Sequence, residues 1–453
     1  MDPVSISTIA DWAGGGLSRG NPAAQADAVC TDSRALKPGA LFVALRGEKF
    51  DGHDFIRQAA QSGAVGAMAE AAPADLGADF AVIRVADTLA ALQRMAAAYR
   101  RTLPMKVIDI TGSNGKTSTK DFTAAVLAMR GRVARTEGNL NNHIGLPLTI
   151  LRASGGDEFG VFEIGMNHPG EIAPLARISR PDAAVITNIG VAHIEHMGSV
   201  EEIALEKGKL AEAVDADGFV VLPAEDAFAK SIAARTRAKV IRAGLERGDV
   251  YASDVAADAD GSSFLAHAGG HAARGRITAP GRHMVGNAML AVAVGLEYGV
   301  TLEECLEALL RAKLTGGRLE RKMVRGISIL DDSYNANPDS MAAALETLGR
   351  MPGRRIAVLG QMNELGAESG RGHRRVGEVA AREKIDCVIT VGNIAAGIAA
   401  AAREHGVKRT LTAETTSEAA VILRSLARDG DTVLIKGSRT VKMETIIEEL
   451  ARP

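Results

Sequence analysis

The sequence predicts an α/β fold of three domains: a small N-terminal α/β domain, a central domain on a parallel sheet, and a Rossmann-like C-terminal domain. Short apolar runs typical of buried strands alternate with helix-length amphipathic segments over most of the chain. At 453 residues, the chain also exceeds what one hydrophobic core normally serves. A break at Pro104 and the Gly316-Gly317 pair predict boundaries, which give domains of residues 1–103, 104–314 and 315–453.

The first domain is expected to be small and mixed. Apolar runs predict strands at residues 41–45 and 65–68, with a helical pattern at residues 54–61 between them. Asp87 is a suitable N-cap for a longer helix, which Pro104 brings to an end. The first strand of the central domain begins directly after this proline.

The central and C-terminal domains share the pattern of a helix-covered parallel sheet. Alternating pieces with glycine turns between residues 248 and 280 add a predicted antiparallel ribbon to the central domain. The C-terminal domain has no GxGxxG after its first strand, so its fold alone implies no dinucleotide. The predicted strands lie at residues 107–110, 161–164, 183–189, 218–222, 327–330, 356–359, 387–391 and 433–435, and further helices at residues 287–296 and 302–310.

The composition excludes several classes of protein. Hydrophobic content of 46% and charged content of 24% are typical of a globular protein. A net charge of -2 gives no electrostatic footprint for nucleic acid. Three well-separated cysteines favour neither a disulfide framework nor a cysteine-based zinc site. The sequence shows no signal peptide and no apolar stretch of bilayer length, so we expect a cytoplasmic protein without membrane insertion.

A glycine-rich loop follows the strand at residues 107–110 and precedes a helical pattern. Glycines let backbone amides approach phosphate oxygens, and the helix N-terminus adds the positive end of its dipole. Lys116 is expected to reach the β- and γ-phosphates of a nucleoside triphosphate, and the Thr117 hydroxyl to bind Mg²⁺. The strict motif has another glycine where this chain has Ile110, so a chance match is the alternative. The predicted phosphate-binding residues are Gly112, Ser113, Asn114, Gly115, Lys116, Thr117 and Ser118.

Three further residues near predicted strands and helices could take part in the same chemistry. Glu163 ends an apolar strand, where it would face the same crevice as the loop. The alternative is an acid in solvent, and the buried residue types on both sides of Glu163 favour the crevice. His193 follows the strand at residues 183–189, and the residues alone do not favour it over His196. Lys207 has the surroundings of an ordinary solvated helix lysine, and we expect it to be exposed.

Polar clusters follow other strands and mark possible ligand contacts. Turn and cap chemistry explains the asparagines of residues 137–145 as well as a ligand does. For residues 331–338, a polar ligand explains the many amides and carboxylates better. The basic residues of 436–439 suit a carboxylate or phosphate, and Arg318 in the hinge could reach a nucleotide when domains close.

These motifs together resemble the Mur ligases, a family of ATP-dependent amide ligases, over nearly the whole chain. Within the family, DDSYNANP is typical of the enzymes that add a dipeptide instead of a single amino acid. The segments that carry the resemblance are TDSRALKPGALFVALRGEKFDGHDF (31–55), GSNGKT (112–117), NLNNHIG (139–145), FEIGMNHPGEI (162–172), DDSYNANP (331–338) and LIKGSR (434–439).

The resemblance implies a UDP-sugar-binding N-terminal domain, a central ATP-binding domain and a mobile C-terminal domain. It implies that D-alanyl-D-alanine is joined to the free carboxylate of UDP-MurNAc-tripeptide while ATP is converted to ADP and phosphate. The γ-phosphoryl group would first activate the carboxylate as an acyl phosphate, with metal and Lys116 neutralising the developing charge. ATP and two Mg²⁺ ions are the implied cofactors, and we expect a monomer.

The resemblance also implies roles for single residues. Thr117 and Glu163 would hold the Mg²⁺ that accompanies ATP, and His193 with Glu163 a second Mg²⁺. Lys207 matches a lysine that related enzymes carry as a carbamate, which would turn a cation into an oxygen ligand. Further nucleotide contacts would come from Asn287, Arg318, Asp332 and Asn335. The UDP substrate and the dipeptide would meet Ser33, Arg34, Asn139, Asn142, Lys436, Ser438 and Arg439.

Two alternative functions remain at this point. One is another ligase of this kind, which adds diaminopimelate or lysine, or a folylpolyglutamate synthase, and residues 332–337 disfavour it. The other is a phosphate-loop protein that uses the nucleotide for binding or switching and makes no amide bond. This alternative leaves the basic cluster at residues 436–439 unexplained. The sequence does not reveal whether the third residue of the tripeptide is diaminopimelate or lysine.

Overall fold

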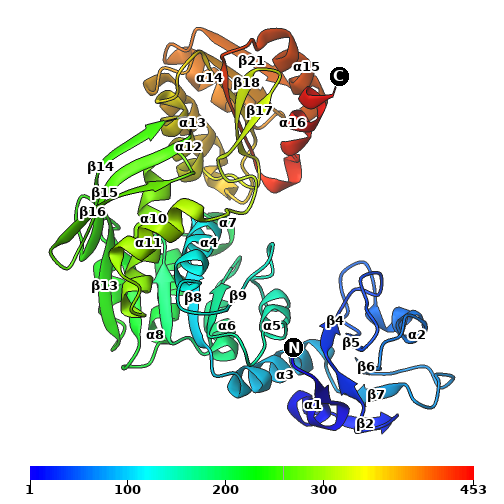
Figure 1. The fold of residues 1–453 in the computed structure, drawn as a ribbon. Helices are drawn as coiled ribbons and strands as arrows, with labels where there is room; N and C mark the ends of the chain where they lie inside the picture. The colour runs from blue at the N-terminus through cyan, green and yellow to red at the C-terminus, as the bar shows by residue number, and fades with distance from the viewer. Residues whose placement is uncertain (259, 453) are drawn as a thin grey trace.

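The computed structural model describes residues 1–258 and 260–452, and three large sheets follow one another along the chain. Figure 1 shows the N-terminal sheet (blue) at the lower right, the central sheet at the left and the C-terminal sheet at the top. The predicted α/β fold of three domains is confirmed. In the described part of the chain, no helix has the length and apolar character needed to cross a membrane.

The N-terminal domain is built on a five-stranded sheet of order β2-β7-β6-β5-β4, in which only β2 runs antiparallel. The strands β1 and β3 of the same domain form a separate, antiparallel two-stranded sheet. The elements are β1 (Val4–Ser5), α1 (Ile6–Ala13), β2 (Gly16–Arg19), β3 (Gln25–Ala26), β4 (Ala28–Cys30), β5 (Ala40–Val43), η1 (Gly52–Phe55), α2 (Ile56–Gln61), β6 (Gly66–Ala69), β7 (Ala81–Arg84) and α3 (Thr88–Thr102).

The central domain carries a nine-stranded sheet of order β16-β15-β14-β13-β12-β11-β8-β10-β9. Its strands run parallel from β9 to β14, and β15 and β16 continue it as the predicted antiparallel ribbon. The elements are β8 (Lys106–Thr111), α4 (Lys116–Leu127), β9 (Val133–Arg135), α5 (Gly145–Ile150), β10 (Phe159–Glu163), α6 (Ile172–Ser179), β11 (Ala183–Ile186), α7 (Ile194–Met197), α8 (Val200–Glu212), β12 (Phe219–Pro223), α9 (Ala229–Ala233), β13 (Lys239–Leu245), β14 (Val250–Asp258), β15 (Gly261–Ala268), β16 (His271–Ile277), α10 (Arg282–Glu297) and α11 (Leu302–Arg311).

The C-terminal domain has a six-stranded sheet of order β17-β18-β22-β19-β20-β21, parallel except for β17. The four predicted strands correspond to β18, β19, β20 and β22. The elements are β17 (Glu320–Val324), β18 (Ile327–Asp332), α12 (Pro338–Gly349), β19 (Arg355–Gly360), η2 (Gly366–Glu368), α13 (Ser369–Arg382), β20 (Cys387–Val391), α14 (Ala396–Glu404), β21 (Arg409–Ala413), α15 (Thr416–Leu426), β22 (Thr432–Lys436), η3 (Arg439–Val441) and α16 (Glu444–Ala451).

Some elements differ from the prediction for identifiable reasons. The strand expected at residues 183–189 ends at Ile186, because the next two polar residues turn to the glycine loop. Asn188 accepts a hydrogen bond from the amide of Asn114 at 2.8 Å, and Thr187 donates one to the carbonyl of the same residue. The strands β9, β17 and β21 were not predicted, because each is an edge strand without a continuous apolar run.

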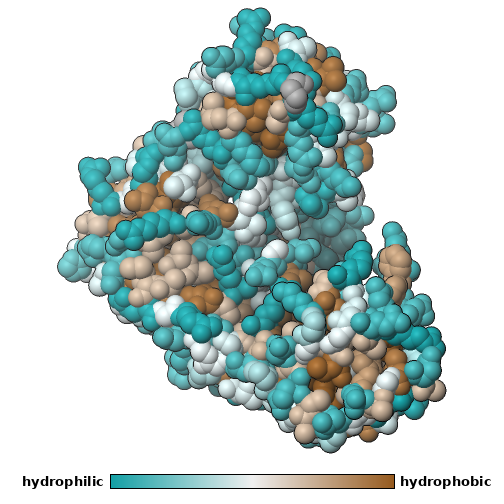
Figure 2. Space-filling model, turned by 45° about the vertical axis from the view of Figure 1, so that its right-hand side comes forward, coloured by the Kyte–Doolittle hydropathy of each residue, from teal (hydrophilic) through white to brown (hydrophobic). Residues whose placement is uncertain are grey.

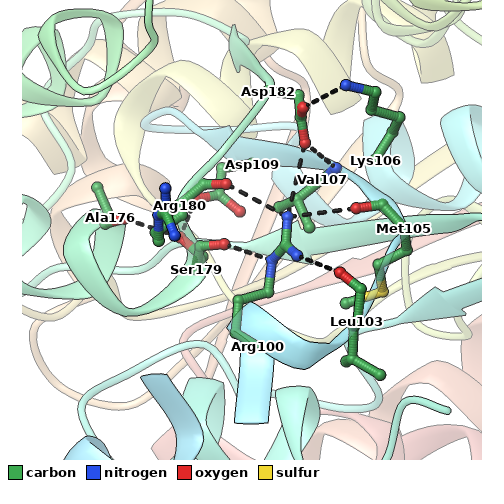
Figure 3. Close-up of polar contacts among 10 residues, drawn as sticks. All are labelled: Arg100, Leu103, Met105, Lys106, Val107, Asp109, Ala176, Ser179, Arg180 and Asp182. Atoms are coloured by element: carbon green, nitrogen blue, oxygen red, sulfur yellow. Dashed lines mark hydrogen bonds and ion pairs between the residues drawn. The ribbon is translucent and has the colours of Figure 1, made fainter. Parts of the chain in front are cut away.

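The N-terminal and central domains are joined through α3, which packs against α1 on one side and against α5 and α6 on the other. Arg100 in the last turn of α3 is buried and lies at the centre of a polar cluster (Figure 3). Its guanidinium group is 3.6 Å from the carboxylate of Asp182, which also accepts from the amide of Val107. The same group donates to the main-chain carbonyl oxygens of Leu103, Met105, Ser179 and Arg180.

The central and C-terminal domains meet at the predicted hinge. Thr315 donates from its amide and its hydroxyl to the buried carboxylate of Asp121 in α4, at 2.7 and 2.8 Å. The short helix α7 packs against η2 of the C-terminal domain. Because α4 begins at the glycine loop, the hinge is bonded to the same helix that positions the loop.

Candidate functional site

A cavity of about 510 Å³ lies between the carboxyl ends of the central strands and the C-terminal domain. It is lined by the glycine loop, by residues that follow β10 and β11, and by the segments after β18, β19 and β22. In Figure 2 the surface is hollowed between the C-terminal domain above and the N-terminal domain at the lower right, and hydrophilic colours predominate around the hollow. A large polar ligand suits such a lining better than an apolar one.

The glycine loop requires glycine at two positions. Gly112 has φ of +151°, and a Cβ there would lie 1.8 Å from the hydroxyl oxygen of Thr187. Gly115 has φ of +79°, and a Cβ there would lie 2.6 Å from the side-chain oxygen of Asn287. Backbone in this conformation brings main-chain amides to the loop surface, and Gly115 begins α4 without a side-chain cap. The first amides of α4 are therefore available to an anion.

Lys116 places its ammonium group inside the loop. The Nζ atom donates to the carbonyl oxygen of Gly112 at 2.8 Å. Burial lowers the pKa of Lys116, while the carboxylate of Glu163 acts in the opposite direction and the charge of Arg318 adds to the lowering. An anion bound in the loop would offset this desolvation and the repulsion between the two cations.

Oxygen and amide groups converge beside the loop. The hydroxyl of Thr117 donates to Glu163 Oε2 at 2.8 Å, and Asn141 Nδ2 donates to Glu163 Oε1 at 2.8 Å. Thr117 and Glu163 are almost fully buried. Among the described residues, no group of three or more His, Cys, Asp or Glu side chains is arranged to hold a metal ion. The donors fit Mg²⁺, which prefers oxygen and completes its shell with water and phosphate.

The structure distinguishes between the two candidate histidines. His193 lines the cavity, and its Nδ1 atom lies 2.5 Å from Glu364 Oε2 of the C-terminal domain. His196 instead lies against His168, with the ring centroids 4.6 Å apart and the rings tilted by 31°. Contact with His193 is the main cause of the lowered pKa of Glu364. Only His193 of the two therefore faces the polar ligand space.

The expectation that Lys207 is solvated is wrong. Its side chain is 1% exposed, and burial lowers its pKa well below the ordinary value, with the charge of Lys116 acting in the same direction. Helix α8 is turned so that Leu205 is 50% exposed whereas Glu206 and Lys207 face inward. Lys207 is not among the residues that line the cavity, but it lies near enough to Lys116 in the glycine loop for the two charges to interact. Burial of this kind favours the neutral form of the amine over the ammonium, and the neutral form is the nucleophilic one.

The C-terminal domain brings predicted residues from two neighbouring strand ends together. Lys436 at the end of β22 lies 2.6 Å from Asp332 Oδ2 at the end of β18, and it donates to the carbonyl of Asn335 at 2.9 Å. Burial raises the pKa of Asp332, and Lys436 opposes this shift. The guanidinium of Arg318 lies 4.3 Å from the ring centroid of Tyr334, and its buried Nε atom has no hydrogen-bond partner among the described residues. These four predicted residues line the cavity wall opposite the loop.

The remaining predicted residues differ in how they are placed. Asn287, Asn139, Asn142, Ser438 and Arg439 line the cavity. The side-chain oxygen of Asn142 accepts a hydrogen bond from the amide of Gly145 at 2.8 Å, so Asn142 also stabilises the turn before α5. Ser438 accepts from the amide of Asn363, and Arg439 pairs with Glu444.

Ser33 and Arg34 lie in the N-terminal domain, away from this cavity. Arg34 forms a two-pronged pair with Asp32, which lowers the pKa of that carboxyl to about 2, and Ser33 donates to Gln58. The structure does not bring these two residues to the loop, and their contact with a UDP group stays a prediction.

Several cavity residues were not predicted. Asn141 contacts Glu163, and Asn188 accepts from the amide of the loop residue Asn114. Asp339 accepts from the amide of Val191 at 3.3 Å, across the domain junction. Asn141 lies within a stretch that the sequence singled out, but spacing alone does not distinguish it from its neighbours. For Asp339, the only signal was its place at the start of a helix.

Three family models match the chain in the order of its three sheets. The Mur ligase family, catalytic domain, matches residues 26–100, the Mur ligase middle domain matches residues 110–295, and the Mur ligase, glutamate ligase domain, matches residues 317–439. Each matched segment falls within one of the predicted domains.

Similar proteins span the whole chain. The UDP-N-acetylmuramoyl-tripeptide--D-alanyl-D-alanine ligase of Escherichia coli (strain K12) is 37% identical over 454 residues, which cover 99% of each chain. The crystal structure of MurF from Acinetobacter baumannii matches with a TM-score of 0.91 at 32% identity, covering 100% of this chain and 99% of that one. MurF ligase from Thermotoga maritima in complex with ADP matches with a TM-score of 0.84 at 29% identity, covering 94% and 97%.

Proposed function

Because the chain belongs to the Mur ligase family, we propose that it joins D-alanyl-D-alanine to UDP-N-acetylmuramoyl-tripeptide in an ATP-dependent reaction. The product is the UDP-MurNAc-pentapeptide used in peptidoglycan synthesis. The observation that carries the proposal is the cavity in which the glycine loop meets the residues of DDSYNANP, the segment typical of dipeptide addition. The ADP complex of the Thermotoga maritima relative supports ATP as the nucleotide.

The residues of the loop suit the activation of a carboxylate. A carboxylate is a poor electrophile, so the γ-phosphoryl group is first transferred to it, and the dipeptide amine then displaces phosphate from the acyl phosphate. Lys116 and the amides at the start of α4 stabilise the charge that develops on the phosphoryl oxygens. Closure of the C-terminal domain excludes water, which would otherwise hydrolyse the acyl phosphate.

Two Mg²⁺ ions would be held beside the loop. Thr117 and Glu163 are proposed to hold the ion that accompanies ATP, since their oxygens already converge. Glu163 and His193 are proposed to hold the second, and a bound ion would supply positive charge to the reacting phosphoryl oxygens. Lys207 is proposed to be a carbamate, because its burial favours the neutral amine, the form that can react with carbon dioxide.

Substrate contacts are proposed for the remaining residues of the three domains, taken as 1–103, 104–314 and 315–453. Arg318, Asp332 and Asn335 would contact the ATP phosphates and ribose, and Asn287 the adenine side. The peptide or dipeptide carboxylate would meet Lys436, Ser438 and Arg439. The UDP-sugar would meet Ser33, Arg34, Asn139 and Asn142.

The function is tested by phosphate release from ATP in complete and incomplete mixtures. We expect turnover only when ATP, UDP-MurNAc-tripeptide and D-alanyl-D-alanine are all present. Diaminopimelate, lysine or glutamate in place of the dipeptide tests the other amide ligases, and none should support turnover. Phosphate release that does not require both the tripeptide and the dipeptide would contradict the proposal. Competition between diaminopimelate- and lysine-containing tripeptides identifies the third residue.

We also propose that the enzyme acts in the cytoplasm as a monomer. Its three cysteines are free thiols, two of them buried, which suits a reducing compartment. Sedimentation at micromolar concentration should give the mass of one chain, 47.2 kDa. A dimer mass would contradict the monomer without affecting the proposed chemistry.

A further inference from the structure

An amide–amide contact joins the glycine loop to the C-terminal domain at the edge of the cavity. Asn337 Nδ2 donates to Asn114 Oδ1 at 2.7 Å, although the two residues lie 223 positions apart in the sequence. Both residues line the cavity, and the chemistry proposed above gives Asn337 no role. The contact is partly buried, and it connects the crest of the phosphate-binding loop with the start of α12.

The helix cap fixes the direction of this hydrogen bond. Asn337 is the N-cap of α12, and its Oδ1 atom accepts from the amide of Ser340 at 2.9 Å. The hydroxyl of Ser340 in turn accepts from the amide of Asn337 at 3.0 Å. A backbone N–H can only donate, so the oxygen of the Asn337 side chain must face Ser340 and its NH₂ group must face Asn114. The cap therefore aims a donor at the loop.

The main chain of the loop sets the position of the acceptor. Asn114 donates from its amide to Asn188 Oδ1 at 2.8 Å, and its carbonyl oxygen accepts from the Thr187 hydroxyl. Both contacts hold the Asn114 backbone against the residues that follow β11. A phosphate bound by the loop amides would contact this same main chain, directly beside the Asn114 side chain.

Building on the function proposed above, we propose that Asn337 is a positioning residue that responds to the loop through Asn114 and couples nucleotide binding to closure of the C-terminal domain. Helix α12 directly follows the segment that carries Asp332 and Asn335, so the contact also sets how far these residues reach toward the nucleotide. A neutral amide pair beside a cavity has a small net energy, because water replaces either partner when the domains separate. The contact can therefore form and break in each turnover.

Asn337→Ser isolates the contact from the helix cap. Serine caps helices about as well as asparagine, but it is too short to reach Asn114. We expect kcat to fall about two- to tenfold, the effect of one neutral hydrogen bond, and the Kd for ADP to rise by no more than the same factor, while the thermal midpoint stays unchanged. Asn114→Ala removes the acceptor of the same hydrogen bond. It keeps the test valid if the protein does not fold with serine at position 337.

The coupling is measured on the full-length protein with the two single variants and the double variant. If the bond carries the effect, the double variant loses no more kcat than one single variant at saturating ATP. Small-angle X-ray scattering should show a smaller decrease in radius of gyration for Asn337→Ser than for wild type when ADP and UDP-MurNAc-tripeptide are added.

Three results would overturn the role of Asn337. They are effects of the two substitutions that multiply, a Kd for ADP that rises by a larger factor than kcat falls, and an unchanged decrease in radius of gyration. A wild-type chain that does not bind ADP would instead contradict the proposed function. Normal ADP binding together with independent effects of the two substitutions would overturn the coupling alone.

Discussion

The two domain junctions of this molecule are built from different contacts. At the N-terminal junction, the guanidinium of Arg100 is buried, bonded to four main-chain carbonyls and close to Asp182 (Figure 3). At the C-terminal junction, single side-chain contacts such as Asn114 with Asn337 and His193 with Glu364 border the cavity. Apolar packing continues across both junctions, so the difference lies in the polar contacts.

This difference indicates which junction can open. Removing Arg100 from its site would leave several buried carbonyls without partners, and each such loss is costly. The contacts at the cavity can be replaced by water at little cost. We therefore interpret the N-terminal and central domains as one fixed frame, against which the C-terminal domain closes over the nucleotide.

The largest effect is expected at the cavity. Lys116→Ala should lower kcat by about a thousandfold, because it removes a charge that acts on the transferred phosphoryl group. Binding of UDP-MurNAc-tripeptide, measured by calorimetry without ATP, should stay within about twofold, since the residues proposed to meet the UDP-sugar do not include Lys116. Loss of this binding would show that the fixed frame and the cavity do not divide the work as proposed.

Arg100→Met tests the fixed junction. It should lower the free energy of unfolding by about 3 kcal/mol, because buried carbonyls lose their donor and Asp182 loses a cation. Urea denaturation measures the change. Arg101→Met is the matched control, since Arg101 is the exposed next residue of the same helix and should change stability by less than about 0.5 kcal/mol. Equal effects of the two substitutions would refute the anchoring role of Arg100.

Lys207→Ala tests whether the buried side chain of Lys207 takes part in the reaction or only in the packing of α8. Activity should fall about a hundredfold, as for other groups that orient a metal site, and millimolar formate or acetate should restore part of it. Lys209→Ala on the same helix is the control, because Lys209 is 36% exposed and pairs with Glu206. A fully active Lys207→Ala variant would exclude the carbamate.

The local parts of this picture could be predicted from the sequence. The glycine loop between a strand and a helix was predicted, because glycine conformations and strand ends are encoded in consecutive residues. The position of Glu163 beside the loop followed from its place at a strand end. Both predictions need only the chain near the residue and the geometry of a parallel sheet.

The other features of the site could not be predicted, because they depend on how each helix is rotated and on which distant segments of the chain meet. The burial of Lys207 and the exposure of Leu205 depend on the rotation of α8, which packing sets and which local polarity did not reveal. The pairing of Asn114 with Asn337 joins residues of two domains, and nothing in either local sequence specifies it. Tertiary contacts of this kind are decided by the whole fold.

The last expected effect is a pH dependence of the fixed junction. Asp109 in β8 is fully buried beside the Arg100 cluster, and burial raises its pKa to about 7 (Figure 3). Its Oδ1 atom has no hydrogen-bond partner in the described part of the chain. Between the ordinary carboxyl pKa near 4 and pH 7, the native state holds a proton that the unfolded state has released. The free energy of unfolding should therefore fall with rising pH by up to about 1.4 kcal/mol per pH unit, and level off above pH 7.

Asp109→Asn isolates this contribution, because asparagine has a similar shape and does not titrate. The difference in the free energy of unfolding between Asp109→Asn and wild type should increase in favour of the variant from pH 5 to pH 7, since all other carboxyls cancel in the comparison. The kcat of the cavity chemistry should not follow the same curve, because Asp109 lies within the fixed frame and outside the cavity lining. Parallel stability curves for the two proteins would show that Asp109 stays ionised in the native state, and the N-terminal junction would then carry a charge balanced by Arg100 instead of a proton.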